Sequence, residues 1–279
     1  MNIAITGASG FVGSRLTERL RSEGHSVKAI SLRNNLNPDD LAEMTAVVHL
    51  AGEPVAQRWS SEVRRKILES RQEGTRKLVK ALQPSPPNVL VSASAIGYYG
   101  ERGDETLTEQ SAPGTGFLCD VAKGWEEEAL KAADFGVRVA RLRIGMVLGP
   151  GGGALQKMLL PFRLGLGARL GNGRQWVSWI HREDLVSLIC FVIREKTLRG
   201  ALNATSPNPV TNAEFTKALG TALHRPAIIA APRFALKLLY GEMAQVILES
   251  QRVVPEATLA AGFEFEYPDL QGALLEILG

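Results

Sequence analysis

The sequence predicts an α/β protein, with a doubly wound parallel sheet followed by a smaller, mostly helical C-terminal lobe. In roughly the first half of its 279 residues, apolar runs of strand length alternate with amphipathic segments of helical length. The first apolar run ends in a glycine-rich turn. The alternation then stops, and helical segments follow between glycine-rich loops. We expect a core over 1–150, to which later segments return. The predicted lobe covers 151–279 and includes a small C-terminal domain from about 230.

Five apolar runs in the core are predicted strands, because each has strand length and ends at a turn signal. They cover residues 2–6, 26–32, 46–50, 88–92 and 137–144. Four segments between them have helical spacing or composition: 11–21, a short one at 39–44, 60–82 and 117–133. The first carries Val12, Leu16 and Leu20 on one stripe, and Gly24 follows its end. Strands separated by helices imply a parallel sheet covered on both faces.

The lobe is expected to be mostly helical. Its predicted helices cover 155–164 around Pro161, 184–194 with Asp184 near the N-terminus, 211–223 and 233–248. Thr211 and Glu214 have the spacing of a capping box. Loops are predicted at 149–153 and in the glycine-rich stretch 165–173.

Composition excludes several classes of protein. A formal charge of +3, without a Lys/Arg block, argues against a nucleic-acid partner. Two isolated cysteines, Cys119 and Cys190, and four scattered histidines form no disulfide or metal-ligand pattern. No signal peptide and no apolar run of bilayer length are present. We expect a protein that is not integral to a membrane and is cytoplasmic, or lies in the plastid stroma if its source is plant-like.

The first turn has the pattern of a phosphate-binding site. Gly7, Gly10 and Gly13 recur every three residues between a predicted strand and a predicted helix. The first glycine permits the tight turn, the second lets a pyrophosphate approach the backbone, and the third lets the helix pack on the sheet. Helix N–H groups then face the phosphates. The turn, with Ser9, Phe11 and Val12, predicts a Rossmann-type dinucleotide site; an ordinary turn without ligand is the alternative.

The end of the second predicted strand indicates which dinucleotide binds. An NAD site places a carboxylate there to bond the ribose 2′-hydroxyl. This chain has Ser31 and Arg33 and no carboxylate. An arginine can pair with a 2′-phosphate and a serine can donate to it, which favours NADP(H). Alternatively, Arg33 is only a solvated charge.

Several segments together resemble the extended and atypical short-chain dehydrogenase/reductase superfamily, and within it the "epimerase family protein" group. The resemblance covers essentially the whole chain. It is carried by the glycine turn and by Leu50-Ala51-Gly52-Glu53-Pro54, Arg58-Trp59, Ser70-Arg71, the stretch from Ser92 to Gly100, Trp125-Glu126, Gly149-Pro150-Gly151-Gly152-Gly153, Trp179-Ile180-His181, Gly241-Glu242-Met243, Gln251-Arg252-Val253-Val254-Pro255 and Gly262-Phe263. Some members of that group are labelled cell-division inhibitor or giant-chloroplast protein.

The resemblance implies further cofactor contacts. Leu50, Ala51 and Gly52 would line the adenine side, and Arg71 would reach back to the cofactor from the long helix. A surface charge on an amphipathic helix is the alternative for Arg71, but the Ser70-Arg71 pair belongs to the group's pattern and favours the cofactor contact. Ile144 would flank the nicotinamide. Ser92 and Lys123 complete the implied cofactor set.

The superfamily's chemistry uses a serine, a tyrosine and a lysine. By resemblance, Ser94 and Lys123 hold the serine and lysine positions. Cys119 stands where the tyrosine is expected, and a thiol side chain is too short to replace a phenol; a small buried residue on a helix face is the simpler account. Tyr98 and Tyr99 follow Ser94, and either could serve as the acid or pack as a lid.

Two further features leave alternatives open. His181 has a suitable ordinary pKa for acid–base work, but a residue that bonds a neighbouring loop is the more common case. A basic set near two tryptophans indicates either recognition of an anionic substrate or a solvated rim. That set comprises Lys157, Arg163, Arg169 and Arg174, near Trp176 and Trp179.

Three functional hypotheses follow. The first is an NADP(H)-dependent oxidoreductase or epimerase acting on a small polar substrate, supported by Ser94 and Lys123. The second is an NADPH-binding regulator without turnover, acting on a protein partner in cell or plastid division, supported by the missing tyrosine. The third is a scaffold whose nucleotide site is vestigial.

Overall fold

The computed structural model describes residues 1–33 and 36–279. Its centre is a six-stranded parallel sheet in the order β11-β6-β4-β3-β1-β2. The strands are β1 (Asn2–Thr6), β2 (Ser26–Ile30), β3 (Ala46–His49), β4 (Val89–Ala95), β6 (Arg138–Ile144) and β11 (Gly200–Ala204). Strand order reverses between β1 and β3, which is where ligands of such sheets bind. The predicted doubly wound α/β fold is confirmed.

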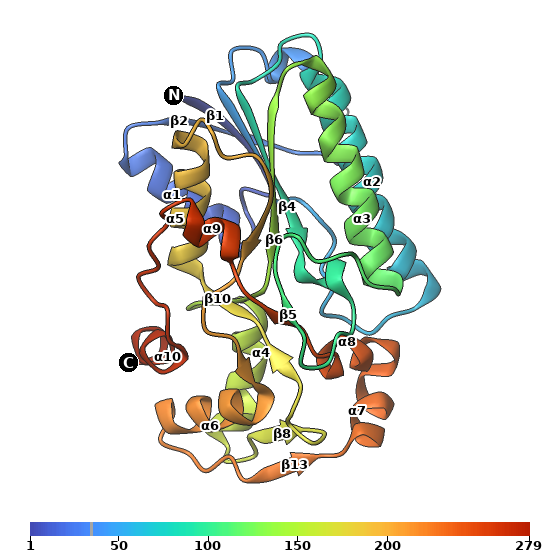
Figure 1. Cartoon of the computed structure of the whole chain (residues 1–279), viewed down its shortest axis with the longest axis vertical. Coiled ribbons are helices and arrows are strands. Elements are labelled where there is room, and N and C mark those ends of the chain that lie inside the picture. The colour runs from blue at the N-terminus through green and yellow to red at the C-terminus, as the bar shows by residue number, and fades with distance from the viewer. Residues whose placement is uncertain (34–35) are drawn as a thin grey trace.

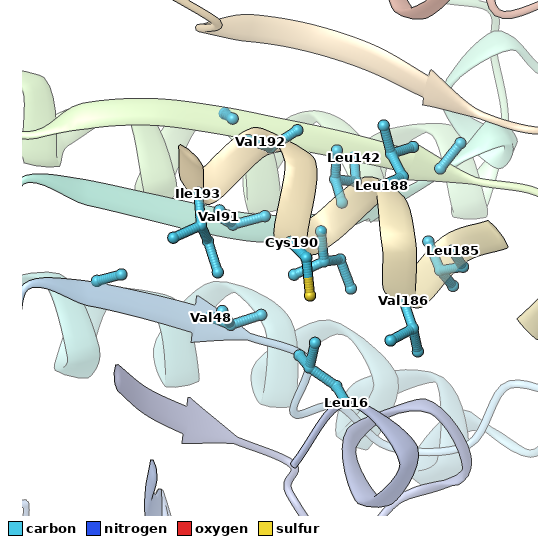
Figure 2. Close-up of a cluster of buried hydrophobic side chains, with 14 of the residues drawn as sticks. Leu16, Val48, Val91, Leu142, Leu185, Val186, Leu188, Cys190, Val192 and Ile193 are labelled. Atoms are coloured by element: carbon cyan, nitrogen blue, oxygen red, sulfur yellow. The ribbon is translucent and has the colours of Figure 1, made fainter. Parts of the chain in front are cut away.

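Helices cover both faces of the sheet (Figure 1). On one face lie α1 (Phe11–Ser22) and α5 (Arg182–Arg194), and on the other α2 (Ser61–Leu82) and α3 (Phe117–Leu130). Ser60 caps α2 by accepting from the Val63 N–H at 3.2 Å. Figure 2 shows the first interface, where Leu16 of α1 and Leu188 of α5 pack against Val48 and Val91 of the sheet. Cys190 belongs to this core and is buried.

A second core supports the lobe, which lies below the sheet in Figure 1. Its helices are α4 (Gly153–Arg163), α6 (Asn212–Ala222), α7 (Arg233–Tyr240), α8 (Ala244–Leu248) and α10 (Leu270–Leu278). Helix α9 (Glu256–Ala260) instead packs against β11 and the first core, beside α5 in Figure 1. Short strand pairs tie them together: β7 (Met146–Leu148) with β10 (Trp179–His181), β8 (Ala168–Leu170) with β13 (Ile229–Ala231), β9 (Trp176–Val177) with β12 (Val210–Thr211), and β5 (Thr106–Leu107) with β14 (Arg252–Val253). Trp179 is fully buried in this second core.

Several element boundaries differ from the prediction. The stretch 233–248 is not one helix, because Gly241 adopts a left-handed φ of 61° and ends α7. The segment 39–44 forms only a short 3₁₀ turn over Pro38–Asp40. Helix α5 begins at Arg182, capped by His181. The capping box of Thr211 and Glu214 is present as predicted.

Strand β11 was not predicted. It lies in sequence within the range assigned to the lobe, yet it forms an edge of the main sheet beside β6. Its sequence, Gly-Ala-Leu-Asn-Ala, lacks the β-branched residues that mark a strand. The division of the chain at residue 150 stays a prediction.

Candidate functional site

The three glycines of the turn between β1 and α1 stand where a side chain would meet backbone atoms. Gly7 has a φ of +74°, and a Cβ atom there would lie 2.9 Å from the Ala51 nitrogen. A Cβ at Gly13 would overlap the carbonyl oxygen of Gly7. The Gly10 N–H donates to that same carbonyl at 2.9 Å, and Gly10 caps α1 without a side chain. The first N–H groups of α1 are thus presented to an anion at the positive end of the helix dipole.

Two other loops meet at this turn. Strand β2 lies beside β1, with Ile30 opposite Thr6, so Ser31 and Arg33 emerge next to the glycines. Both are exposed, and the Ser31 Oγ accepts from the Arg33 N–H at 3.3 Å, which leaves the hydroxyl proton free. Strand β3 lies on the other side of β1, so the segment from Leu50 to Gly52 borders the same crevice. Ser9 is exposed at the turn, and Val12 and Ile144 pack against the first core.

Arg71 of α2 is folded back onto the loop after β3. Its Nη1 donates to the carbonyl oxygens of Glu53 at 3.0 Å and Ile67 at 3.3 Å. A Cβ at Gly52 would lie 3.2 Å from the Arg71 Cζ, so the glycine makes room for the guanidinium. The guanidinium carbon also lies 5.1 Å from the Trp125 ring centroid. Burial lowers the pKa of Arg71 to about 10. Arg71 therefore shapes the crevice wall; its contact with a cofactor stays a prediction.

A buried hydrogen-bond chain runs behind this wall, and the sequence did not indicate it. Thr6 accepts from the Ala51 N–H at 3.3 Å, and its hydroxyl lies 2.6 Å from His49 Nδ1. His49 Nε2 lies 2.9 Å from the Thr75 hydroxyl, which donates to the Arg71 carbonyl. Every group in this series has a donor and an acceptor when the Thr6 hydroxyl donates to Nδ1 and the neutral His49 imidazole donates from Nε2 to Thr75. Burial, reinforced by the Arg71 charge, lowers the pKa of His49 to about 4.

Acidification should therefore destabilise the fold through His49. An unfolded chain takes up this proton near the ordinary pKa of 6.5, whereas the folded protein resists it until about 4, so stability falls as pH drops through that window. The expected contribution is about 2 kcal/mol between pH 7.5 and pH 5. Urea unfolding at the two pH values, in the wild type and in His49→Gln, measures it. Equal pH dependence in both proteins would contradict the assignment.

Glu126 of α3 organises a second buried cluster over the ends of β4 and β6. It is 3% exposed and carries four hydrogen bonds. Oε1 accepts from Ser94 Oγ at 2.8 Å and from Arg143 Nε at 2.8 Å. Oε2 accepts from Arg141 Nη1 at 2.8 Å and Arg143 Nη2 at 3.0 Å. A carboxylate held by two arginines accepts only, so the Ser94 proton points at Glu126. Nearby, Ser92 is also buried, and its hydroxyl donates to the Ala93 carbonyl at 3.1 Å.

The two neighbouring tyrosines have different surroundings. Tyr99 is fully buried; its hydroxyl accepts from Arg143 Nη1 at 3.0 Å and donates to Asn203 Oδ1 at 2.7 Å. Burial raises the pKa of Tyr99 to about 12, which makes it a poor proton donor at neutral pH. Tyr98 is partly exposed, and the Arg143 guanidinium carbon lies 3.5 Å from its ring centroid. Of the two, Tyr98 is the one that can face a ligand.

Cys119 is held by the backbone around it. It is 1% exposed, and its thiol donates to the carbonyl oxygens of Gly114 at 2.9 Å and Tyr98 at 3.2 Å. Burial raises the pKa of this thiol, which disfavours the thiolate. Lys123 lies one turn further along α3 and is half-buried. The thiol therefore links α3 to the Tyr98 loop.

The remaining polar candidates lie in the lobe. His181 caps α5; its Nε2 lies 3.0 Å from Glu276 of α10, and its Nδ1 accepts from the Glu183 N–H at 3.3 Å. Two cavities, of about 490 and 590 Å³, flank α7 and α8 and share Lys237 and Gln245. Arg174 is the one member of the predicted basic set that lines either cavity as described. Among residues 1–33 and 36–279, no three His, Cys, Asp or Glu side chains cluster to hold a metal ion.

Comparison with known proteins identifies the family. Residues 3–204 match the NAD dependent epimerase/dehydratase family. The chain belongs to that family. Residues 231–277 match a domain of unknown function that covers α7 to α10. The predicted resemblance to the epimerase group of the short-chain dehydrogenase/reductase superfamily is confirmed.

Relatives of this epimerase/dehydratase family member match it along its whole length. It is 41% identical to the Arabidopsis thaliana epimerase family protein SDR39U1 homolog, chloroplastic, over all of this chain and 87% of the relative. It is 36% identical to Homo sapiens epimerase family protein SDR39U1, over the whole of both chains. The crystal structure of human SDR39U1 (isoform2) with NADPH superposes with a TM-score of 0.91 at 35% identity, covering 100% of this chain and 99% of the other.

A Corynebacterium glutamicum nucleoside-diphosphate sugar epimerase superposes with a TM-score of 0.84 at 34% identity, covering all of this chain and 58% of the other. In the part of the chain that the structure describes, no helix combines the length and hydropathy needed to cross a membrane.

Proposed function

We propose that this protein binds NADP(H) at the crevice between β1 and β3. The observation that carries the proposal is the pairing of a turn built on Gly7, Gly10 and Gly13 with Ser31 and Arg33 at the end of β2. The turn presents α1 N–H groups to the pyrophosphate, and the exposed arginine and serine suit a 2′-phosphate. No carboxylate stands at the end of β2 to bond a free 2′-hydroxyl. The human relative crystallised with NADPH supports the same choice.

Arg33 should set the preference for the phosphorylated cofactor. Replacing it by alanine is expected to weaken NADPH binding about tenfold or more, because a charge-assisted bond to phosphate contributes about 1.5–3 kcal/mol. NADH affinity should stay within about twofold, since NADH carries no 2′-phosphate. Isothermal titration with both cofactors at two salt concentrations measures this.

The matched control is Arg65→Ala, which removes an exposed arginine of α2 whose partner is Glu69. It should leave both affinities unchanged. Equal loss of NADPH and NADH affinity in Arg33→Ala would contradict a 2′-phosphate contact, and wild-type protein that prefers NADH would contradict the proposed cofactor.

We propose further that the protein uses this cofactor as an oxidoreductase or epimerase acting on a small polar substrate. When bound, NADP(H) supplies or accepts a hydride at its nicotinamide ring. The protein must then move one proton to or from the substrate oxygen. Tyr98, which is partly exposed, is the candidate for that step, because the Cys119 thiol, the Ser94 proton and the Tyr99 hydroxyl are each bonded inside the protein. NADPH oxidation by a panel of carbonyl compounds, lost in Tyr98→Phe, is the test.

These internal hydrogen bonds of Cys119, Ser94 and Tyr99 also support a second candidate, an NADPH-binding regulator without turnover. Cys119 replaces the family's proton-transfer group with a buried thiol that serves the backbone. This candidate expects NADPH binding with no hydride transfer to any compound of the panel. Turnover that disappears in Tyr98→Phe would exclude it.

A further inference from the structure

The loop between β7 and α4 wraps the ring of Phe11, the first residue of α1. Cβ atoms at Gly149, Gly152 and Gly153 would lie 3.2, 2.6 and 2.9 Å from atoms of that ring. The loop can approach the ring only because these three positions have no side chain. The glycine run therefore brings the lobe into direct contact with the start of the phosphate-binding helix.

Arg182, the first residue of α5, lies over the same ring. Its guanidinium carbon is 5.0 Å from the Phe11 ring centroid, and its Nη1 donates to the Pro150 carbonyl at 3.1 Å. The side chain is 16% exposed. Phe11 thus lies between an arginine and a glycine loop, and all three meet at the start of α1, directly after the glycine turn.

Arg182 has one ion-pair partner, Glu183, and it shares that carboxylate with Arg15. Glu183 is 3.6 Å from its Nε, beyond hydrogen-bond distance, and the same carboxylate is bonded by Arg15 Nε at 2.8 Å. Within the described residues, the buried Nε of Arg182 has no hydrogen-bond partner. An arginine has five N–H donors, and here the Pro150 carbonyl takes one. Leaving charged donors unpaired in a buried place costs about 1–3 kcal/mol or more, so an anionic acceptor is expected.

We propose that Arg182 binds the pyrophosphate of the dinucleotide, with Phe11 and the loop 149–153 holding the guanidinium in place. This inference rests on the proposed NADP(H) function and adds a residue of α5 to it. The α1 N–H groups contact the diphosphate from the turn, and Arg182 supplies the full positive charge that a helix terminus lacks. Through its bond to the Pro150 carbonyl, the same side chain also fixes the loop 149–153 beside the cofactor.

The test compares two ligands in one variant. Arg182→Met keeps an apolar stem over Phe11 and removes every donor. It should weaken NADPH binding about tenfold or more in isothermal titration and leave adenosine 2′-phosphate, which has no pyrophosphate, within about twofold. The dependence of NADPH affinity on salt should also become less steep, because one phosphate contact is lost.

Arg194→Met is the matched control, since Arg194 is exposed at the other end of the same helix. It should leave both ligands unaffected. If Arg182→Met does not fold, Arg182→Gln replaces it in the same comparison. Unchanged NADPH affinity, or equal loss for both ligands, would overturn the role of Arg182 while leaving the proposed function intact. Wild-type protein that binds no NADPH would overturn both.

Discussion

Replacing Glu126 by glutamine is expected to lower the free energy of unfolding by about 3–5 kcal/mol, because one partner of a buried charge cluster is removed. The carboxylate is 3% exposed and serves Ser94, Arg141 and Arg143 together. A neutral amide of the same shape leaves the buried Arg143 and the partly buried Arg141 without the anion that they share. It also turns an N–H₂ group toward donors that need an acceptor. Urea unfolding followed by circular dichroism at pH 7.5 measures the loss.

Glu127 provides the control on the same helix. It is the next residue of α3 and is exposed, so Glu127→Gln should change stability by less than about 0.5 kcal/mol. A loss of under 1 kcal/mol in Glu126→Gln would mean that water solvates the arginines. In that case the Ser94 proton would also be free to reach a ligand, and Ser94 would regain the donor role that its position suggests.

The Glu126 cluster links the cofactor crevice to the C-terminal segment. Arg143 donates to Tyr99, Tyr99 donates to Asn203 of β11, and the Asn203 amide donates to the Val254 carbonyl at 2.9 Å. Glu109 adds a second link, since it accepts from the backbone N–H groups of Asn203 and Ala257. Continuous hydrogen bonds therefore join the C-terminal domain to the groups around Ser94.

Local signals were enough to predict the glycine turn and the elements that flank it. The strand, the glycines and the helix lie within the first 22 residues, and the glycines mark backbone positions where a side chain would meet other backbone atoms. Likewise, Thr211 and Glu214 cap α6 using four consecutive residues. Such features can be predicted from one sequence because the interacting residues are close together in the chain.

The cluster around Ser94 could not be predicted in this way. Arg141 and Arg143 alternate with apolar residues along β6, a pattern typical of a strand with one solvated face. The structure buries that face under α3, and Glu126 of this helix supplies the counter-charge. Nothing in the sequence indicates that Glu126 and the two arginines face each other. Tyr98 and Tyr99 are equivalent by sequence, and only the folded chain shows that the second is bonded to Asn203.

Gly13→Ala should abolish useful cofactor binding. A Cβ atom at this position would overlap the carbonyl oxygen of Gly7, which is backbone and cannot swing aside as a side chain can. Either α1 or the turn must move, and the N–H groups aimed at the pyrophosphate move with it. NADPH affinity in isothermal titration is expected to fall about 100-fold or more, because at least two charge-assisted bonds are lost. Overpacking should also lower the free energy of unfolding by about 1–3 kcal/mol.

Gly74→Ala makes the same substitution at a helical glycine with space around it. A Cβ at Gly74 would meet Leu32 Cδ1 at 3.6 Å, an ordinary van der Waals contact, and alanine is the better helix former by up to about 1 kcal/mol. This variant should be as stable as the wild type or more stable, with NADPH affinity unchanged. If the free energy of unfolding falls in Gly13→Ala and rises in Gly74→Ala, the phosphate-binding turn requires glycine for its close packing. Wild-type NADPH affinity in Gly13→Ala would refute the geometry on which the cofactor site depends.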